Sequence, residues 1–365
     1  MKKTVLILTN TLWGVFNFRR EVVDAIAEKG YDIILTTPDS GKSDFFIEKG
    51  YRVVVIPFDR KSKSVIADLK LLYSYYKLMK KEKPSVVLSY TIKPNIYGGL
   101  ASRICHIPLI ANITGLGTAV ETPGKFQKMM LLLLKIGLKR ATTVFFQNQE
   151  NLEFFEKHHI TYGRKILIPG SGVNINYHKL QDYPIEHPIK FIFIGRMLKE
   201  KGIELYLNAA EYLKQKYPYV EFHIVGSDEG HYKGKVEELQ ERGIVKYHGT
   251  TSDIRPFIGQ SHCTVHPSYY PEGMSNVLLE SCAAGRPVIT TDKSGCCEIV
   301  EDGKTGFIVK QRDSEDLERK METFLLLPYE QKKAMGLAAR QKVKREFNRE
   351  IVVKAYLSEI EDCAP

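Results

Sequence analysis

Short apolar runs alternate with longer segments of helical periodicity along most of the chain. In the first half the pattern predicts strands at 5–9, 32–37, 52–56, 85–89, 109–112 and 143–146, with helices near 17–29, 64–82, 95–105, 125–140 and 148–157. In the second half it predicts strands at 189–194, 220–225, 244–248, 262–266 and 288–290, helices at 200–216, 231–241, 252–259 and 275–284, and closing helices near 313–327, 329–346 and 349–361. Such alternation is typical of parallel sheets covered by helices on both faces.

The two alternating halves are separated by residues 169–188, which are rich in Pro, Gly and polar residues and have the composition of a linker. A chain of 365 residues, 43% of them hydrophobic, is long enough for two cores. The simplest architecture is α/β, with two doubly wound Rossmann-like domains that face each other across a cleft. We expect an N-terminal domain at 1–172, a second domain at 187–346, and a C-terminal helix at 347–365 that packs back on the first domain.

Composition and charge restrict the classes of function. The sequence contains no run of 18 apolar residues, and its six cysteines lack C-x-x-C spacing, which indicates reduced thiols rather than a zinc site. The net charge of +10 is concentrated in residues 1–180, where 27 Lys+Arg face 14 Asp+Glu. Residues 61–83 and 125–140 set lysines among Leu, Met and Tyr, a pattern typical of helices that bind an anionic membrane surface. The alternative for either helix is a core-facing helix whose lysines reach water. The charge is not accompanied by a nucleic-acid recognition motif, so nucleic acid is not an expected partner.

One segment joins a predicted strand to a predicted helix and carries two carboxylates. It runs from Pro267 to Glu280 and reads P-S-Y-Y-P-E-G-M-S-N-V-L-L-E. Gly273 frees the backbone, and Ser275 and Asn276 suit a helix N-cap, so amides at this helix N-terminus can bind phosphate. Glu272 and Glu280 can accept hydrogen bonds from hydroxyls on either side of a phosphate, as in a nucleotide-sugar site. From spacing alone, a surface turn with a solvated helix is an equal alternative.

A second motif places two cations after the first strand of the second half. Gly195 ends that strand, Arg196 follows it, and Lys201 begins the next helix. Arginine offers paired donors and lysine a point charge, which together suit a diphosphate. In the first half, Gly14 lies in the turn after the first strand and is either an ordinary turn glycine or a point where amides approach a phosphate. G-x-G-x-x-G is absent, and so is D-x-D, so we expect neither a dinucleotide nor a metal.

Taken together, G-R-x-x-x-x-K-G and the E-x7-E that begins within P-S-x-x-x-E-G resemble the retaining GT-B glycosyltransferases of family 4, the glycosyl transferases group 1. Gly285–Ile289 and Asp302–Phe307 agree with that family. Lys93–Asn95 and Ala111–Gly117 resemble its bacterial subgroup, which extends lipid-linked sugars for capsule, O-antigen or N-glycan precursors.

The resemblance implies a role for each motif residue. Arg196 and Lys201 would hold the donor diphosphate, Glu280 would bind the ribose hydroxyls, and Glu272 would bind hydroxyls of the donor sugar. The phosphate cradle would be completed by the backbone at Gly14, Gly195, Gly273, Met274, Ser275 and Asn276. Many members carry a histidine where this chain has Ile92. The residue that orients the acceptor is therefore open, and the candidates are Lys93, Asn95 and Thr114.

The resulting hypothesis is a metal-independent, retaining hexosyltransferase that needs no cofactor. It would move a sugar, an N-acetylhexosamine by the subgroup resemblance, from a UDP-sugar to a polyprenyl-diphosphate-linked sugar in surface polysaccharide or glycan precursor assembly. We expect a cytoplasmic protein, peripheral on the inner face of the plasma membrane. One alternative is a GT-B nucleotide-sugar epimerase, for which the sequence lacks a convincing acid/base set. The other is a non-catalytic nucleotide-sugar-binding protein, against which the intact set of two cations and two carboxylates argues.

Overall fold

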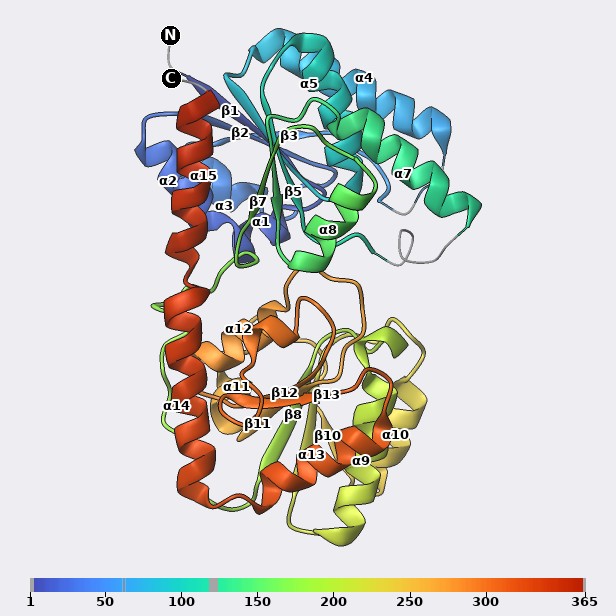
Figure 1. Ribbon diagram of the computed structural model, residues 1–365, viewed down its shortest axis with the longest axis vertical. Coiled ribbons are helices and arrows are strands. Elements are labelled where there is room, and N and C mark those ends of the chain that lie inside the picture. Colours follow the sequence, from blue (N-terminus) through green and yellow to red (C-terminus); the bar gives the residue numbers. More distant parts are fainter. Residues whose placement is uncertain (1–2, 61, 63, 118–123, 364–365) are drawn as a thin grey trace. The chain divides into compact units, whose positions relative to one another are not determined.

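The computed structural model describes residues 3–60, 62, 64–117 and 124–363. The chain forms two compact units, each built on a parallel sheet with helices on its faces (Figure 1). The first unit comprises Met1–Gly172, Glu272–Met274 and Arg349–Pro365, and the second comprises Val173–Pro271 and Ser275–Asn348. The predicted class, two Rossmann-like α/β domains, is confirmed.

The first unit contains a seven-stranded sheet in the order β3-β2-β1-β4-β5-β6-β7, and every pairing is parallel. Its strands are β1 (Thr4–Leu8), β2 (Asp32–Thr37), β3 (Arg52–Val55), β4 (Val86–Tyr90), β5 (Leu109–Ile113), β6 (Thr143–Phe146) and β7 (Arg164–Leu167). The central strands β4 and β5 are buried along their whole length, because helices cover both faces of the sheet.

Alternate residues of β1 belong to two separate cores. Leu6 and Leu8 pack with residues of α4, α5 and α7 on one face, and Val5 and Ile7 pack with residues of α1, α2 and α15 on the other. The helices of this unit are α1 (Leu12–Phe18), α2 (Arg20–Glu28), α3 (Ser43–Glu48), α4 (Val65–Glu82), α5 (Gly99–Cys105), α7 (Lys125–Leu138), α8 (Gln149–Lys157) and α15 (Arg349–Cys363), and the π-helix η1 (Pro94–Gly98) precedes α5. The C-terminal helix α15 is thus part of the first unit, where it contacts α2.

The second unit contains a six-stranded parallel sheet in the order β10-β9-β8-β11-β12-β13. Its strands are β8 (Lys190–Ile194), β9 (Glu221–Val225), β10 (Val245–Tyr247), β11 (Cys263–His266), β12 (Val288–Thr291) and β13 (Gly306–Val309). Its helices are η2 (Lys199–Lys201), α9 (Ile203–Lys216), α10 (Lys233–Glu241), α11 (Arg255–Gln260), α12 (Asn276–Ala283), η3 (Cys297–Ile299), α13 (Ser314–Leu326) and α14 (Tyr329–Glu346).

The order of strands reverses once in each sheet, and ligands of such sheets bind at that point, beyond the carboxyl ends of the strands. In the first unit the reversal lies between β1 and β4, and in the second between β8 and β11. The loops that follow these four strands are therefore the places to look for a site.

The structure differs from the sequence prediction at several elements. The helix predicted at 17–29 is two helices, α1 and α2, which meet at Arg19. The prediction of a turn around Gly14 is wrong, because Gly14 is the third residue of α1. The short helix α3 and the edge strands β7 and β13 were not predicted; β7 reads R-K-I-L and has no buried residue that would mark it as a strand.

The segment interpreted as a linker is held tightly to the second unit as far as residue 185. The fully buried Arg286 donates hydrogen bonds to the carbonyls of Gln181 and Asp182, while His262 accepts from the Lys190 amide (3.0 Å) and bonds the Ile185 carbonyl (2.8 Å). All six cysteines are free thiols. Within the described residues, no helix has the length and hydrophobicity required to cross a membrane.

Candidate active site

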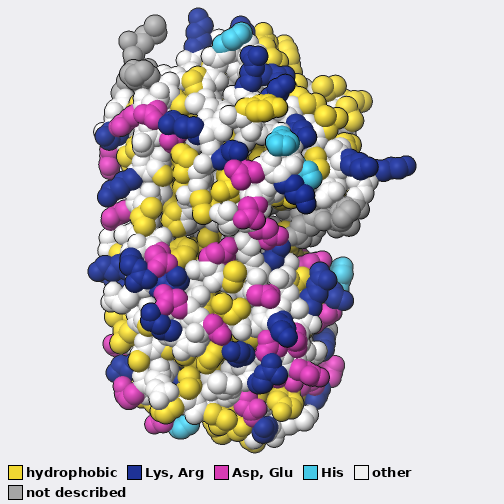
Figure 2. Space-filling view, in the orientation of Figure 1, with side chains coloured by type: hydrophobic (Ala, Val, Ile, Leu, Met, Phe, Trp, Pro, Cys, Tyr) yellow, Lys and Arg dark blue, Asp and Glu magenta, His cyan; other side chains and the backbone are white. Residues whose placement is uncertain are grey.

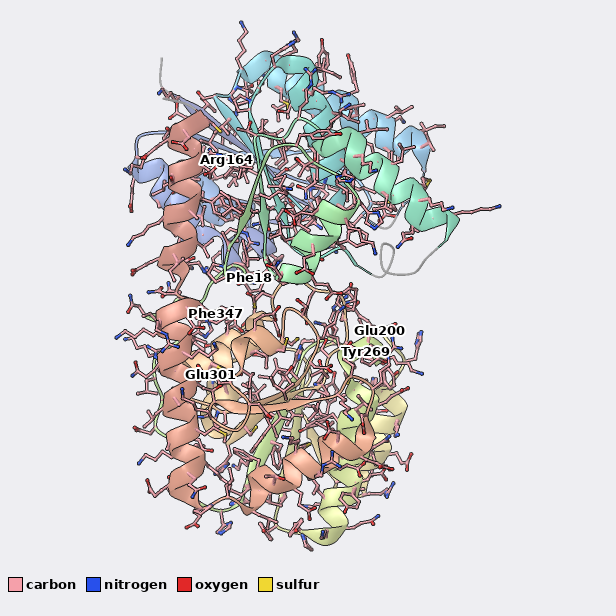
Figure 3. The ribbon with its side chains drawn as sticks, viewed as in Figure 1. Phe18, Arg164, Glu200, Tyr269, Glu301 and Phe347 are labelled. Carbon is pink, nitrogen blue, oxygen red and sulfur yellow. The ribbon has the colours of Figure 1, made fainter. Side chains whose placement is uncertain are left out.

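At the reversal point of the second sheet, the loop after β8 and the loop after β11 pack against each other. The Tyr269 amide donates to the Glu200 carbonyl (2.8 Å), and the two residues lie next to each other in Figure 3. Gly202 has φ +78°, and a Cβ there would lie 2.2 Å from the Pro267 carbonyl oxygen. This close approach requires glycine and fixes the two loops relative to each other.

The two predicted cations lie close to one aromatic ring. The ring centre of Tyr270 is 5.5 Å from the Arg196 guanidinium carbon and 5.1 Å from Lys201 Nζ. Lys201 is 8% exposed, and Arg196 pairs with Glu229 (3.2 Å) at the surface. Burial lowers the pKa of Arg196, but hydrogen bonds with Tyr270 and Glu229 outweigh it and raise that pKa. The prediction missed Tyr270 and Glu229, since no spacing rule links them to the cations.

Glu280 lies one turn into α12, as its spacing from the predicted N-cap suggested. Ser275 is the N-cap; its side chain makes no capping bond, but its amide donates to the Gly295 carbonyl (2.8 Å). The Glu280 carboxylate lies 3.8 Å from His178 Nε2. The prediction missed His178 because it lies in the segment interpreted as a linker, which the Arg340 side chain anchors by a bond to the His178 carbonyl (2.7 Å).

The middle of the predicted motif packs with the first unit. The Gly273 amide donates to the Thr114 carbonyl (3.1 Å), and Asn148 Nδ2 donates to the carbonyls of Glu272 (3.0 Å) and Gly273 (2.6 Å). A Cβ on Gly273 would lie 2.9 Å from the Thr114 carbonyl oxygen and 2.4 Å from Gln147 Oε1, so a larger residue would have to displace backbone. The structure thus brings Thr114 beside Gly273 and identifies Asn148 and Gln147, which the sequence did not single out. Met274 packs against Gly170 in the same unit.

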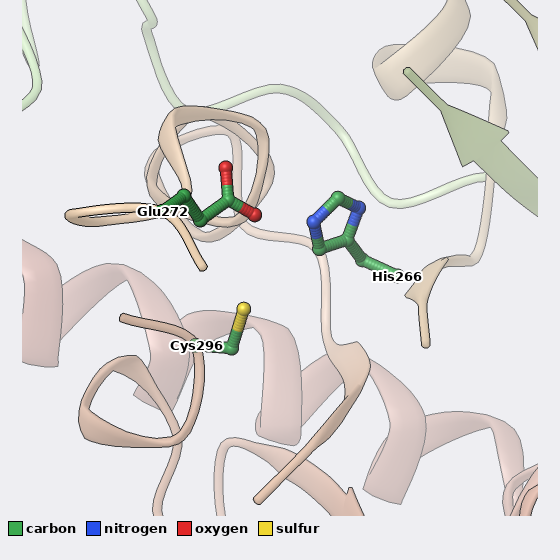
Figure 4. Close-up of side chains that lie close together, drawn as sticks. All are labelled: His266, Glu272 and Cys296. Carbon is green, nitrogen blue, oxygen red and sulfur yellow. The ribbon is translucent and has the colours of Figure 1, made fainter. Parts of the chain in front are cut away.

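The end of β11, the loop after it and the loop after β12 bring together a group of possible metal ligands. His266, Glu272 and Cys296 have ligand atoms within 4.8 Å of one another (Figure 4). Imidazole, carboxylate and thiolate are all ligands that Zn²⁺ accepts. A search for the D-x-D motif could not find this group, because its members are dispersed in the sequence.

The other two acceptor candidates already have protein partners. Lys93 Nζ bonds Asp68 Oδ1 (2.7 Å) and the Ser62 carbonyl (2.8 Å). Asn95 is buried: its amide donates to the Asn112 carbonyl (3.0 Å), and its oxygen accepts from Ser89 Oγ (2.7 Å). Asn95 therefore ties β4 to β5, and Lys93 anchors the start of α4.

The chain matches two family models that together span most of its length. Residues 179–342 match "Glycosyl transferases group 1", and residues 4–148 match "Glycosyl transferase 4-like".

Curated relatives match over nearly the whole chain. A protein of Campylobacter jejuni subsp. jejuni serotype O:2, named N,N'-diacetylbacillosaminyl-diphospho-undecaprenol alpha-1,3-N-acetylgalactosaminyltransferase, is 25% identical and covers 94% of each chain. An Escherichia coli protein, named UDP-Gal:alpha-D-GlcNAc-diphosphoundecaprenol alpha-1,3-galactosyltransferase, is 27% identical over 83% of this chain and 82% of its own.

Solved structures have the same fold. The crystal structure of Anabaena HepE in complex with UDP superimposes with a TM-score of 0.78 at 19% identity, over 99% of this chain and 100% of its own. This likeness shows the GT-B fold. The two family models assign the domains: residues 179–342 carry a glycosyl transferases group 1 domain, and residues 4–148 carry a glycosyl transferase 4-like domain.

Proposed function

We propose that this glycosyltransferase moves a sugar from a UDP-sugar to a polyprenyl-diphosphate-linked sugar during polysaccharide or glycan precursor assembly. The observation that carries the proposal is the pair Arg196 and Lys201, both close to the Tyr270 ring at the reversal point of the second sheet, with Glu280 one turn into α12. Two cations beside a helix N-terminus suit a diphosphate, and a carboxylate one turn in suits ribose hydroxyls. The names of both curated relatives specify diphosphoundecaprenol-linked acceptors, which supports the acceptor class.

The proposed chemistry is transfer with retention, without a metal. The acceptor hydroxyl oxygen bonds the anomeric carbon on the face from which UDP departs, as the bond from that carbon to the phosphate oxygen breaks. The hydroxyl proton passes to an oxygen of the departing diphosphate. Arg196 and Lys201 neutralise the charge that develops there, an effect that in other enzymes contributes several kcal/mol. Glu272 holds the donor sugar, for which we propose an N-acetylhexosamine.

We also propose that the enzyme works at the inner face of the plasma membrane and binds it through α4 and α7. One side of each helix is buried in the core, and the opposite side exposes an apolar stripe (Figure 2). The exposed stripe consists of Val65, Ile66, Leu69 and Tyr73 on α4 and of Phe126, Met129, Leu132 and Ile136 on α7. Exposed lysines flank both stripes: Lys70, Lys77, Lys80, Lys81 and Lys83 on and after α4, and Lys125, Lys128, Lys135 and Lys139 on and after α7. Apolar and cationic groups on one surface suit an anionic leaflet.

The test is transfer by purified protein offered UDP-, GDP- and dTDP-sugars, with and without a short polyprenyl-diphosphate-linked sugar, and with or without a chelator. We expect UDP release from one UDP-N-acetylhexosamine, stimulated by the lipid acceptor, unchanged by chelator, with the anomeric configuration kept in the product. Loss of activity with chelator would overturn metal independence and turn attention to His266, Glu272 and Cys296. Interconversion of the sugar without acceptor would identify an epimerase, and tight UDP binding without turnover on any acceptor would indicate a binding protein.

A further inference from the structure

Two arginines of the first unit are equally buried, but only one has a carboxylate partner. Arg19 and Arg349 are each 7% exposed. Arg349 bonds Glu21 (2.5 Å) and the Gly172 carbonyl (3.0 Å), so both its charge and its N–H groups are matched. Arg19 bonds the Phe18 carbonyl (2.9 Å), its guanidinium carbon lies 5.0 Å from the Tyr90 ring centre, and it hydrogen-bonds the side chains of Tyr90 and Tyr356. Within the described chain no carboxylate pairs with Arg19. Burying a cation without an anion is costly, so such a residue indicates an anionic ligand.

Arg19 lies where a doubly wound sheet binds ligands. It follows β1 through α1, and the ring beside it, Tyr90, is the last residue of β4. The strand order of the first unit reverses between β1 and β4. The guanidinium is therefore held at the reversal point of this sheet, in the position equivalent to that of the Arg196 loop in the second unit.

The residue after Tyr90 gives an independent sign of a site. Thr91 has φ +73°, a conformation that a β-branched residue adopts only under strain, and its hydroxyl is buried without a hydrogen bond to the described protein. The π-helix η1 begins three residues later, at Pro94, and such helices are frequent at functional sites. The fold thus keeps a strained backbone and an unused hydroxyl at the residue that follows Tyr90, whose ring contacts a cation without a carboxylate partner.

The first unit needs such a cation because the proposed reaction contains two diphosphates. Arg196 and Lys201 provide charge for the donor diphosphate, and the acceptor carries a second. Lys93 cannot match it, because its ammonium is already paired with Asp68 (2.7 Å). Asn95 has no charge, and its amide nitrogen and oxygen already bond Asn112 and Ser89.

We propose that Arg19 binds the diphosphate of the lipid-linked acceptor, and that the Thr91 hydroxyl donates to the same group. This inference rests on the proposed function and deepens it by assigning the acceptor subsite to residues other than Lys93 and Asn95. Arg19 acts through charge-assisted hydrogen bonds to phosphate oxygens, so lysine at this position would keep the charge but lose the paired donors.

The experiment compares Arg19→Lys, Arg19→Gln and Thr91→Ala with wild type. A farnesyl-diphosphate-linked N-acetylhexosamine and its monophosphate analogue serve as acceptors. We expect the KM for the diphosphate acceptor to rise about 10-fold in Arg19→Lys and about 100-fold in Arg19→Gln, since a bond to a charged group is worth that much. The KM for UDP-sugar should change less than about 2-fold. The preference of wild type for diphosphate over monophosphate should shrink in both Arg19 variants.

Arg349→Lys is the matched control. Because Arg349 has a carboxylate partner, its substitution should lower the Tm without changing the acceptor KM, whereas the Arg19 variants should change the acceptor KM more than the Tm. If wild type shows no preference for the diphosphate acceptor, the proposed acceptor class is wrong and this inference with it. If wild type shows the preference and the Arg19 variants keep it, the inference alone is overturned. A rise in the KM for UDP-sugar instead would assign Arg19 to the donor.

Discussion

Glu272 and Glu280 lie eight residues apart in one motif, yet the structure gives them different surroundings. Glu280 is set by α12 and lies beside His178 in the second unit. Glu272 is held by its own backbone, whose carbonyl accepts from Asn148 in the first unit. The two carboxylates are therefore positioned by separate parts of the fold. A division of work, one on the nucleotide and one on the sugar, fits this arrangement better than a joint acid/base pair.

Replacing each carboxylate by alanine should separate these roles. In Glu272→Ala we expect turnover to fall by at least about 100-fold while UDP affinity stays within about 3-fold, because only the sugar contact is lost. In Glu280→Ala the Kd for UDP should rise about 10- to 100-fold, the usual value of a hydrogen bond to a charged group. Calorimetric titration with UDP and steady-state rates measure the two effects. A large loss of UDP affinity in Glu272→Ala would contradict the assignment.

Among the residues of the candidate site, spacing along the sequence predicted those that lie close together in the chain. It could not predict those that come from distant segments. Arg196 and Lys201 follow one strand, so their proximity could be predicted. Tyr270, which contacts both, follows another strand about seventy residues later, and only the strand order brings it there. Arg19 was missed for a different reason, since a buried arginine without a carboxylate partner can be recognised only when the surrounding side chains are placed.

Between elements, His262 joins β11 to the segment that precedes β8. Its ring accepts from the Lys190 amide and donates to the Ile185 carbonyl, so it must be neutral in the folded protein. Burial, together with the charges of Lys332, Arg286 and Lys190, lowers the pKa of His262 to about 4, although the bond to Ile185 opposes the shift. In the unfolded chain the same ring has a pKa of about 6.5.

This difference predicts a loss of stability in acid. The unfolded chain takes up a proton at His262 below about pH 6.5 and the folded chain only near pH 4, so the free energy of unfolding falls as the pH decreases between these values. We expect His262 to account for about 2 kcal/mol of that fall. Urea denaturation of wild type and His262→Gln at pH 7.5, 5.5 and 4.5 measures it.

His262→Gln should have a lower free energy of unfolding than wild type at pH 7.5. The difference between the two free energies should decrease as the pH falls. His187 is a suitable control position in the same segment, because within the part of the chain that the structure describes its side chain makes no hydrogen bond and its ring packs against Tyr219. A gap that stays constant with pH would show that the His262 ring titrates alike in both states.

Most elements could be predicted because their apolar patterns are strong. Central strands such as β2 and β6 were predicted with the observed bounds, since a strand buried on both faces is a continuous apolar run. Edge strands lack such a run: β7 has no buried residue and carries two basic residues. The break between α1 and α2 was missed because no proline or glycine marks it; the chain turns at Arg19, whose φ of −137° ends one helix and begins the next.

Over the whole molecule, the excess of positive charge lies in residues 1–180, and so do the exposed apolar stripes of α4 and α7. The lysines alone would be explained by solubility. Solubility does not explain Val65 and Ile66, which are about 70% exposed, since exposed apolar side chains gathered on one surface mark an interaction site. The helix surfaces turned away from the core therefore carry the properties of a membrane-binding face, while their opposite sides hold Leu71, Tyr75 and Leu134 in the core.

Charge reversal on this face should release the protein from anionic vesicles. Each lysine near such a surface contributes about 1 kcal/mol, so replacing five of them by glutamate should lower vesicle binding more than 100-fold. The five are Lys77, Lys80, Lys81, Lys135 and Lys139, all exposed. The matched control reverses five exposed lysines of the second unit: Lys233, Lys235, Lys310, Lys333 and Lys344. Sedimentation with phosphatidylglycerol vesicles compares the variants. An equal loss of vesicle binding in both variants would indicate that the net charge decides binding and not the face on α4 and α7. A loss in the first variant alone, together with release of wild type by added salt, would assign the membrane contact to α4 and α7.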